Sequence, residues 1–262
     1  MNPPASPQSV VTSSGPEALF AVTCFDDGVR AEMRTGPWSS GPGSAGSLGV
    51  LADNVLGYAL ITEAPAGLWS VSAEISLDFF RPPPGDGTKL HAKGHMVHTT
   101  GTTGLAEGSI FDDDGRLVSR CRQWGRYVEP RGPVPDSRPA GSPPAEGFLN
   151  EIRSQVSTRE GYAELRVDVG DDLINPIGSL HGGISLWLAE LTAGAAVGGA
   201  RSGFVPASLT ATYPRPFPHG DVATFRAEVV SRGRRMAVTR ITGSNRAGKP
   251  CVVATVHHHD PH

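Results

Sequence analysis

The sequence predicts an α+β fold built from two similar units within one chain of 262 residues. A proline-rich stretch divides the chain into near-equal halves. Each half begins with a strand pattern, continues through a glycine-rich segment into one helix, and ends with further strands. We therefore expect a disordered N-terminal tail at 1–16, a first unit at 17–128, a linker at 129–147 and a second unit at 148–262.

The second half shows this order of elements most clearly. Apolar and polar residues alternate from Ala163 to Val169, which predicts a half-buried strand. Apolar residues then recur at helical spacing from Ile184 to Ala195. Four strand-like runs bounded by Gly, Pro or Asn complete the unit, at 208–213, 222–230, 236–243 and 251–257.

The first half repeats the pattern. A strand is expected at 29–34, a helix near 47–61, a strand with strict alternation at 71–79, and strands at 89–98, 103–111 and 116–128. The helices align with Asp53 at the position of Glu190, each preceded by Leu-Ala. The two halves therefore read as a duplication.

Composition narrows the classes of partner. The chain has 23 basic and 26 acidic residues, a net charge of −3, and 38% hydrophobic residues. No basic stripe or polybasic patch occurs, so neither nucleic acid nor a membrane surface is expected, and a small molecule is the predicted partner. The three cysteines lack metal-ligand spacing, and we see no signal peptide and no run of ~18 apolar residues. We expect a cytoplasmic protein without a metal.

The most informative segment surrounds the start of the second helix. Asn175 lies six positions before His181, which is followed by Gly182 and Gly183, and Glu190 lies nine positions after the histidine. A helix start presents free N–H groups and the positive end of the helix dipole. Glycines there let a substrate carbonyl approach the backbone, so the segment is suited to binding an oxyanion.

This spacing resembles that of the hotdog-fold acyl-CoA thioesterases of the phenylacetate and hydroxybenzoate degradation type. The second half carries the whole pattern, and the first half carries the acid and an Arg-Pro strand end at 81–82. The resemblance implies antiparallel sheets wrapped around long helices, joined into one continuous sheet as a double hotdog with antiparallel helices. It also implies hydrolysis of an acyl-CoA thioester, with coenzyme A as part of the substrate and no other cofactor.

The resemblance implies a composite site. Nine helical residues rise about 13 Å, so Glu190 cannot reach a thioester held at the start of its own helix. Antiparallel packing instead brings the middle of the first helix to that point. At the position of His181 the first half has Ser44, so its own helix start has lost the polar residues. We expect one working site formed by Asp53, Asn175, His181, Gly182 and Gly183, and a degenerate second site at Glu190 and Ser44.

Similar enzymes also use a Ser or Thr on the strand after the helix, ten residues before a proline. The first half has Ser72 ten residues before Pro82, whereas the second half has Pro206 at the corresponding position. Strict alternation places Ser72 opposite Val71 and Ala73. If the apolar side of the strand covers the helix, Ser72 reaches the site only through a β-bulge or at the interface of the units.

The pattern suggests roles without choosing a single mechanism. Asp53 either deprotonates a water or attacks the thioester directly to give a transient anhydride. Ser72 would orient the water or the carboxylate, and the N–H of Gly182 or Gly183 would stabilise the oxyanion. Asn175 and His181 would hold the loop and the thioester carbonyl. A solvated Asp53 on the polar side of its helix is the structural alternative.

Other functions remain open at this point. A non-catalytic acyl-CoA binding or regulatory module is the main alternative, and a dehydratase of the same fold is disfavoured because neither helix has a His in its middle.

Aromatic and medium-chain acyl groups both fit the pattern. We expect the side chains around Val50, Tyr58, Trp69 and Trp187 to set the pocket depth, and the tandem chain to form a homodimer.

Overall fold

The computed structural model describes residues 9–10, 15–25, 29–85, 87–129 and 146–261. The first half contains β1 (Ser9–Val10), α1 (Gly15–Leu19), β2 (Val22–Phe25), β3 (Arg30–Arg34), η1 (Pro37–Ser39), α2 (Leu48–Thr62), β4 (Trp69–Phe79), β5 (Lys89–Thr99), β6 (Thr103–Asp112) and β7 (Leu117–Val128). The second half contains α3 (Glu146–Ser154), β8 (Ser157–Arg159), β9 (Tyr162–Asp168), η2 (Asp171–Leu173), α4 (Gly182–Ala196), η3 (Gly199–Ser202), β10 (Val205–Thr212), β11 (Val222–Arg232), β12 (Met236–Ser244) and β13 (Pro250–His259).

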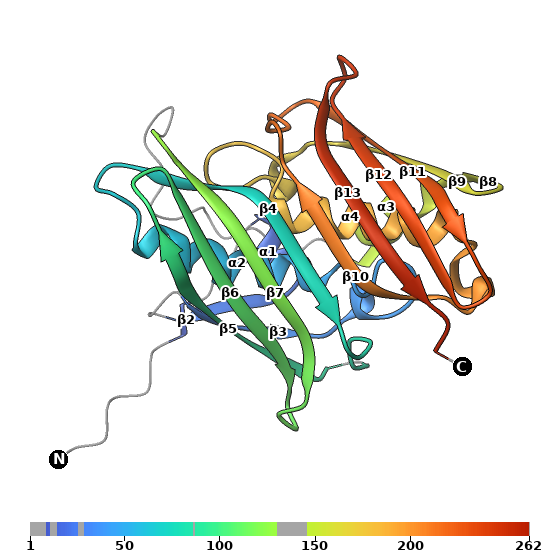
Figure 1. Cartoon of the computed structure of the whole chain (residues 1–262), viewed down its shortest axis with the longest axis horizontal. Coiled ribbons are helices and arrows are strands. Elements are labelled where there is room, and N and C mark those ends of the chain that lie inside the picture. Colours follow the sequence, from blue (N-terminus) through green and yellow to red (C-terminus); the bar gives the residue numbers. More distant parts are fainter. Residues whose placement is uncertain (1–8, 11–14, 26–28, 86, 130–145, 262) are drawn as a thin grey trace.

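The described strands form one antiparallel sheet of 13 strands, in the order β1-β2-β3-β5-β6-β7-β4-β10-β13-β12-β11-β9-β8. The two halves meet where β4 pairs with β10, with Leu77 opposite Leu209. Figure 1 shows the two halves side by side, with α2 and α4 lying against the same face of the sheet. The continuous sheet and the double-hotdog arrangement predicted above are therefore confirmed.

Helices α2 and α4 form the centre of the molecule. Both are apolar on nearly all sides, as expected for helices buried between a sheet and a neighbouring helix. Each contains a single charged residue, Asp53 in α2 and Glu190 in α4, and both carboxylates are buried. A carboxylate in such surroundings needs hydrogen-bond donors, because burying an unpartnered charge costs several kcal/mol.

Glycines allow the two helices to cross at very short distance. A Cβ atom at Gly183 would lie 2.5 Å from the carbonyl oxygen of Gly49, and one at Gly49 would lie 2.7 Å from Cβ of Leu186. Larger residues at either position would push the helices apart. This close crossing places the middle of α2 directly beside the first turn of α4.

A β-bulge in β4 changes which side chains face the helices. Its pairing with β7 shifts between Ser72 and Glu74, so Ala73 has no partner across the ladder. Ser72 therefore faces inward before the bulge, and Ile75 faces inward after it. Of the two routes expected for Ser72, a bulge or a position at the interface of the units, the strand has the bulge, and the expected unbroken alternation over 71–79 is wrong. Strand β10 has a matching shift between 206 and 208, as a duplication would predict.

Several short elements were not expected from the sequence. Strand β1 and the first residues of α1 lie within the 1–16 segment that we expected to be disordered, and α3 begins in the last residues of the expected linker and continues into the second unit. Phe20, just after α1, is fully buried and packs edge-on against Trp38 and Trp187. This contact anchors the N-terminal segment to α4. Residues 130–145 of the expected linker lie outside the described residues.

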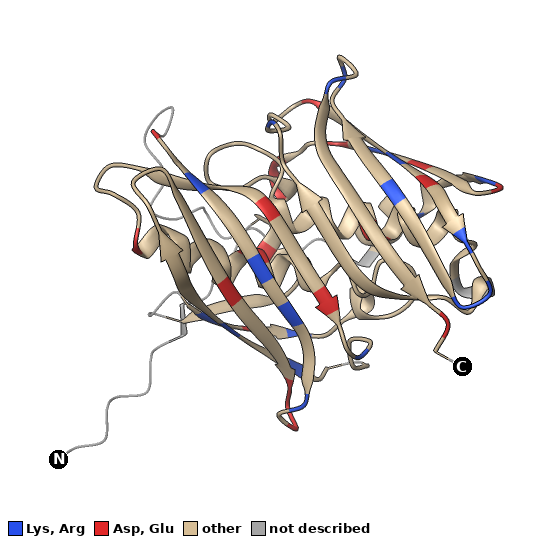
Figure 2. Cartoon of the chain, viewed as in Figure 1, with Lys and Arg blue, Asp and Glu red and all other residues tan. Residues whose placement is uncertain are grey.

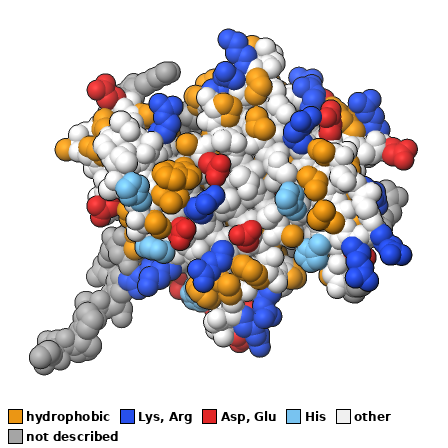
Figure 3. Space-filling view, in the orientation of Figure 1, with side chains coloured by type: hydrophobic (Ala, Val, Ile, Leu, Met, Phe, Trp, Pro, Cys, Tyr) orange, Lys and Arg blue, Asp and Glu red, His pale blue; other side chains and the backbone are white. Residues whose placement is uncertain are grey.

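The outer face of the sheet carries both signs of charge. Figure 2 shows acidic and basic positions interspersed on β4, β6 and β7, and the Glu74 and Arg122 side chains pair at 3.4 Å. Figure 3 shows hydrophobic and His side chains scattered among the charges on the same face. Within the described part of the chain, none of the helices is both long and apolar enough to cross a membrane.

Candidate active site

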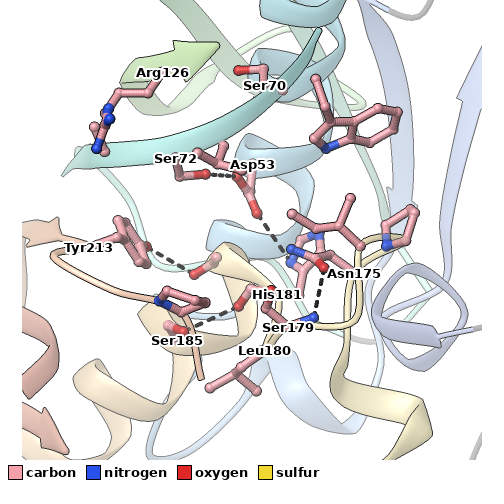
Figure 4. A pocket seen from close by; sticks show the side chains of 18 of the residues that line it. Asp53, Ser70, Ser72, Arg126, Asn175, Ser179, Leu180, His181, Ser185 and Tyr213 are labelled. Carbon is pink, nitrogen blue, oxygen red and sulfur yellow. Dashed lines mark hydrogen bonds and ion pairs between the residues drawn. The ribbon is translucent and has the colours of Figure 1, made fainter. Parts of the chain in front are cut away.

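The carboxylate of Asp53 lies at the N-terminus of α4, which belongs to the other half of the chain. The backbone N–H of Gly183 donates to Asp53 Oδ2 at 2.9 Å. Figure 4 shows the Asp53 carboxylate in contact with Ser72 on one side and His181 on the other. The positive end of the α4 dipole stabilises a negative charge at this point. The geometry thus brings together the acid of one half and the helix start of the other, although the Gly183 N–H is engaged by Asp53 and does not face open space.

Ser72 and Gln123 extend the cluster on the sheet side. Ser72 Oγ donates to Asp53 Oδ1 at 3.1 Å, and Gln123 Nε2 donates to Ser72 Oγ at 3.0 Å. Gln123 lies on β7 and is 2% exposed, and its Oε1 is buried without a hydrogen-bond partner among the described protein groups. Gln123 thus holds the Ser72 hydroxyl, which in turn donates to Asp53.

His181 is the N-cap of α4 and is buried next to Asp53. Its Nδ1 accepts from the N–H of Gly183 at 3.1 Å and lies 3.3 Å from Asp53 Oδ2. Its Nε2 lies 3.5 Å from Oε1 of Glu17, a residue of α1. The imidazole therefore lies between two carboxylates.

Asn175 shapes the loop that leads into α4. Its Oδ1 accepts from the N–H of Ser179 at 3.0 Å, which closes a tight turn, and the residue lines the same pocket as Asp53. Tyr213, after β10, donates its hydroxyl to the carbonyl oxygen of Gly182 at 3.0 Å. Burial and the nearby charge of Asp53 raise the pKa of Tyr213 well above its ordinary value, so its hydroxyl stays a donor.

A pocket of about 640 Å³ opens beside these groups, with walls from both halves of the chain. Gly57 lies one turn beyond Asp53 on α2, and no atom lies within 4 Å of where its Cβ would be. Tyr58 and Trp69 line the pocket as expected. Val50 and Trp187 are instead fully buried in the core and are not among the residues that line it, so their expected role in setting its depth is wrong.

The pocket differs in character between its deeper wall and its exposed rim. Ile61, Val71 and Val128 give an apolar wall, whereas Arg126 and Arg215 line the pocket from exposed positions. Arg215 also donates a hydrogen bond to the carbonyl oxygen of Pro250. The pocket therefore offers an apolar surface and two guanidinium groups to a ligand.

The corresponding place in the other half is filled. Glu190 Oε2 accepts from the backbone N–H of Gly46 at 3.1 Å, which mirrors the contact between Asp53 and Gly183. Ser44 contributes backbone hydrogen bonds to its turn: its N–H donates to the carbonyl oxygen of Gly41 at 3.2 Å, and its own carbonyl oxygen accepts from Ser47 Oγ at 2.6 Å. Burial raises the pKa of Glu190 to about 7, although the Gly46 N–H and the charge of Arg153 oppose this shift. The indole of Trp187 stands beside Gly43 where a ligand would need space.

Three residues of the cluster were not predicted from the sequence. Gln123 left a signal, because it is a polar residue at an inward position of β7 between Cys121 and Gly125. The sequence contains no comparable signal for Glu17 or Tyr213. Both depend on contacts between segments far apart in the chain.

Two family models match the chain. One is described as the acyl-CoA thioesterase C-terminal domain and matches residues 29–127, and the other as the acyl-CoA thioesterase N-terminal domain and matches residues 171–259. Together they account for well over half of the sequence. The descriptions assign the halves in the reverse of their order along this chain. A search of curated proteins gave no match.

Solved structures of similar fold cover nearly the whole chain. A tesB protein of Mycobacterium avium subspecies paratuberculosis has a TM-score of 0.66 at 15% identity, covering 94% of this chain and 98% of its own. A putative thioesterase II of Thermobifida fusca has a TM-score of 0.64 at 14% identity, covering 94% and 99%. A putative oleoyl thioesterase of Lactobacillus plantarum has a TM-score of 0.62 at 13% identity, covering 88% and 96%. At these identities the likeness concerns the fold.

Proposed function

The chain belongs to the hotdog-fold acyl-CoA thioesterase family, and on this premise we propose that it hydrolyses an acyl-CoA thioester at the cluster around Asp53. The observation that carries the proposal is the contact of the Asp53 carboxylate with the first turn of α4, inside a pocket walled by both halves. Thioester hydrolysis needs a base or nucleophile and a donor for the oxyanion at one point.

The proposed reaction uses water as the second substrate. Asp53 takes a proton from a water molecule whose oxygen attacks the thioester carbon, the C–S bond then breaks, and the thiolate of coenzyme A leaves and is protonated. Ser72 supports this general-base route, because its hydroxyl donates to Asp53 and is itself held in place by Gln123. Direct attack by Asp53 is the competing route.

The oxyanion is proposed to form at the α4 N-terminus. Gly182 and Gly183 carry the first N–H groups of the helix, and Tyr213 donates a hydrogen bond to the Gly182 carbonyl oxygen. Because Gly183 N–H donates to Asp53, the substrate oxygen would either use Gly182 N–H or share that of Gly183. A donor of this kind contributes roughly 3 kcal/mol to transition-state stabilisation in comparable sites.

The pocket favours a coenzyme A substrate with an apolar acyl group. The wall around Gly57 and Ile61 is apolar and open, which suits a hydrocarbon or an aromatic ring. The guanidinium groups of Arg126 and Arg215 are suited to the phosphates of coenzyme A. On sequence grounds we further propose two hotdog units at 17–128 and 148–262, a cytoplasmic location and a homodimer of the tandem chain.

Release of free coenzyme A tests the function. Incubation with short, medium and long aliphatic acyl-CoAs and with benzoyl- and phenylacetyl-CoA, followed by a thiol reagent, is expected to give turnover with at least one of them. Matched acyl-N-acetylcysteamine thioesters, which lack the phosphates, should have a lower kcat/KM. Tight binding of acyl-CoA without release of free thiol would instead favour the non-catalytic module.

The hydrogen bonds of Ser72 should contribute to kcat. Ser72→Ala removes the donor to Asp53 Oδ1 and the acceptor for Gln123, so kcat is expected to fall about tenfold. Ser70→Ala is the matched control, because Ser70 is buried on the same strand and its hydroxyl has no hydrogen-bond partner among the described groups. Steady-state kinetics on the preferred thioester provide the measurement, and equal losses in both variants would contradict the role of Ser72.

A further inference from the structure

Glu17 lies outside both matched segments, yet its side chain reaches the cluster. It belongs to α1, which precedes residue 29, and its side chain is 15% exposed. Its Oε1 lies 3.5 Å from His181 Nε2 and accepts from Asn54 Nδ2 at 3.4 Å. It also lines the pocket. The N-terminal segment thus adds to the site a charged group that lies outside both matched segments.

The position of Glu17 is fixed by its neighbours along the chain. Leu19 and Phe20 are buried in the core, and Phe20 packs against Trp187 of α4. Asn54 in turn accepts at Oδ1 from the thiol of Cys24 on β2, so its amide is oriented toward Glu17. A buried carboxylate held in this way has a defined partner in His181.

The contacts of His181 favour a protonated ring. Its Nε2 faces Glu17, so a proton on Nε2 is required for that contact. The other ring nitrogen, Nδ1, lies 3.3 Å from Asp53 Oδ2. In a neutral ring with its proton on Nε2, the lone pair of Nδ1 would face the carboxylate oxygen. Both atoms would then share the single N–H of Gly183 as their donor. A proton on Nδ1 turns this contact into a donor and an acceptor. In that state Nδ1 no longer accepts from Gly183, and the Gly183 N–H donates to Asp53 alone.

Resting on the function proposed above, we propose that Glu17 is a positioning residue that, together with Asp53, holds His181 as an imidazolium whose Nδ1–H faces the Asp53 carboxylate. The positive ring then lies beside the place where the oxyanion forms and stabilises it. Glu17 touches neither substrate nor water in this role. It acts through His181.

The electrostatic surroundings agree with this role. Burial alone would raise the pKa of Glu17, but the hydrogen bond and charge of His181, with the contact to Asn54, outweigh burial and lower it. The other titratable groups that face the pair are Asp53 and Tyr58 from α2, Cys24 from β2 and Tyr213 after β10. From η2, which packs against α1, Asp171 pairs at the surface with His219, and Asp172 is exposed.

The test separates charge from shape. Glu17→Gln keeps the size and an oxygen acceptor for Nε2–H but removes the charge, whereas Glu17→Ala removes both. A neighbouring carboxylate favours a cation by 1–3 pH units. In Glu17→Gln the alkaline limb of kcat/KM is therefore expected to move down by about one pH unit, with rates below the limb close to those of the native protein. Glu17→Ala should show the same shift and a lower kcat at every pH.

A second readout does not depend on turnover. The ring-nitrogen chemical shifts of His181, assigned with His181→Asn, should show loss of the imidazolium about one pH unit lower in Glu17→Gln than in the native chain. Glu107→Gln on the outer face of β6 is the matched control and should leave both measurements unchanged. An unaltered His181 titration in Glu17→Gln would overturn the proposal, as would a uniform loss of activity without any shift. Absence of turnover in the native chain would instead count against the proposed function, and the ring-nitrogen titration would still decide the role of Glu17.

Discussion

Asp53→Asn is expected to lower kcat by about 10³-fold, because the amide cannot accept a proton from water or attack the thioester. The substitution keeps the size of the side chain and an oxygen to accept from Gly183 N–H, so the fold should survive. Release of free coenzyme A, followed under saturating substrate, provides the measurement. Thermal unfolding of the variant would show whether the loss is chemical.

Glu190→Gln is the matched control for this experiment. Glu190 occupies the equivalent place in α4 and contacts Gly46 N–H, but the aromatic side chains around Trp187 leave no room for a ligand there. Turnover in Glu190→Gln should therefore stay close to that of the native chain. If Glu190→Gln were inactive and Asp53→Asn active, the assignment of the two sites would have to be exchanged.

The same Glu190→Gln substitution should strongly stabilise the fold above neutral pH. Burial raises the pKa of Glu190 to about 7 in the folded state, against the ordinary value of 4.5 for a glutamate side chain. Below about pH 4.5 the carboxyl is protonated in both states and costs nothing. As the pH rises from there to 7, the unfolded state ionises while the buried carboxyl keeps its proton, so the cost to folding grows to about 3 kcal/mol. Above pH 7 the folded state ionises as well, and the cost stays level.

Glutamine cannot ionise, so the stability gain of Glu190→Gln should be near zero at pH 4.5, reach about 3 kcal/mol by pH 8 and stay level above it. Its amide oxygen can still accept from Gly46 N–H. Denaturant unfolding at a series of pH values would measure the gain, with Glu107→Gln as an exposed control. A gain independent of pH would mean that ionisation of Glu190 is not its cause.

Much of the fold could be predicted from the periodicity of the sequence. The helices and long strands span enough residues to show a clear period of 3.6 or 2, and their predicted bounds agree closely with α2, α4 and β4 to β7. Elements of two to five residues, such as β1, α1 and β8, are too short to produce a period. The bulge at Ala73 was foreseen only because Ser72 had to face inward.

Part of the cluster around Asp53 could be predicted from the sequence. That part depends on the spacing of residues along one helix and on the antiparallel packing of the two helices. Asp53, Ser72, His181 and Gly183 lie within hydrogen-bonding distance of one another in a chain of contacts. What the sequence could not reveal is that Gly183 N–H donates to Asp53, because this depends on tenths of an ångström in the helix crossing. Glu17 was unpredictable for a related reason, since only the tertiary fold brings α1 to the histidine.

The different surroundings of the Asp53 and Glu190 carboxylates have a wider consequence. In a symmetric pair of identical subunits, every substitution occurs at both catalytic centres, so neither can change its role without the other. Here one polypeptide contains both copies, and Trp187 fills the space beside Glu190 without altering the surroundings of Asp53. Because the two units are joined in one chain, side chains can fill the pocket of one unit while the equivalent site keeps its pocket and its polar groups.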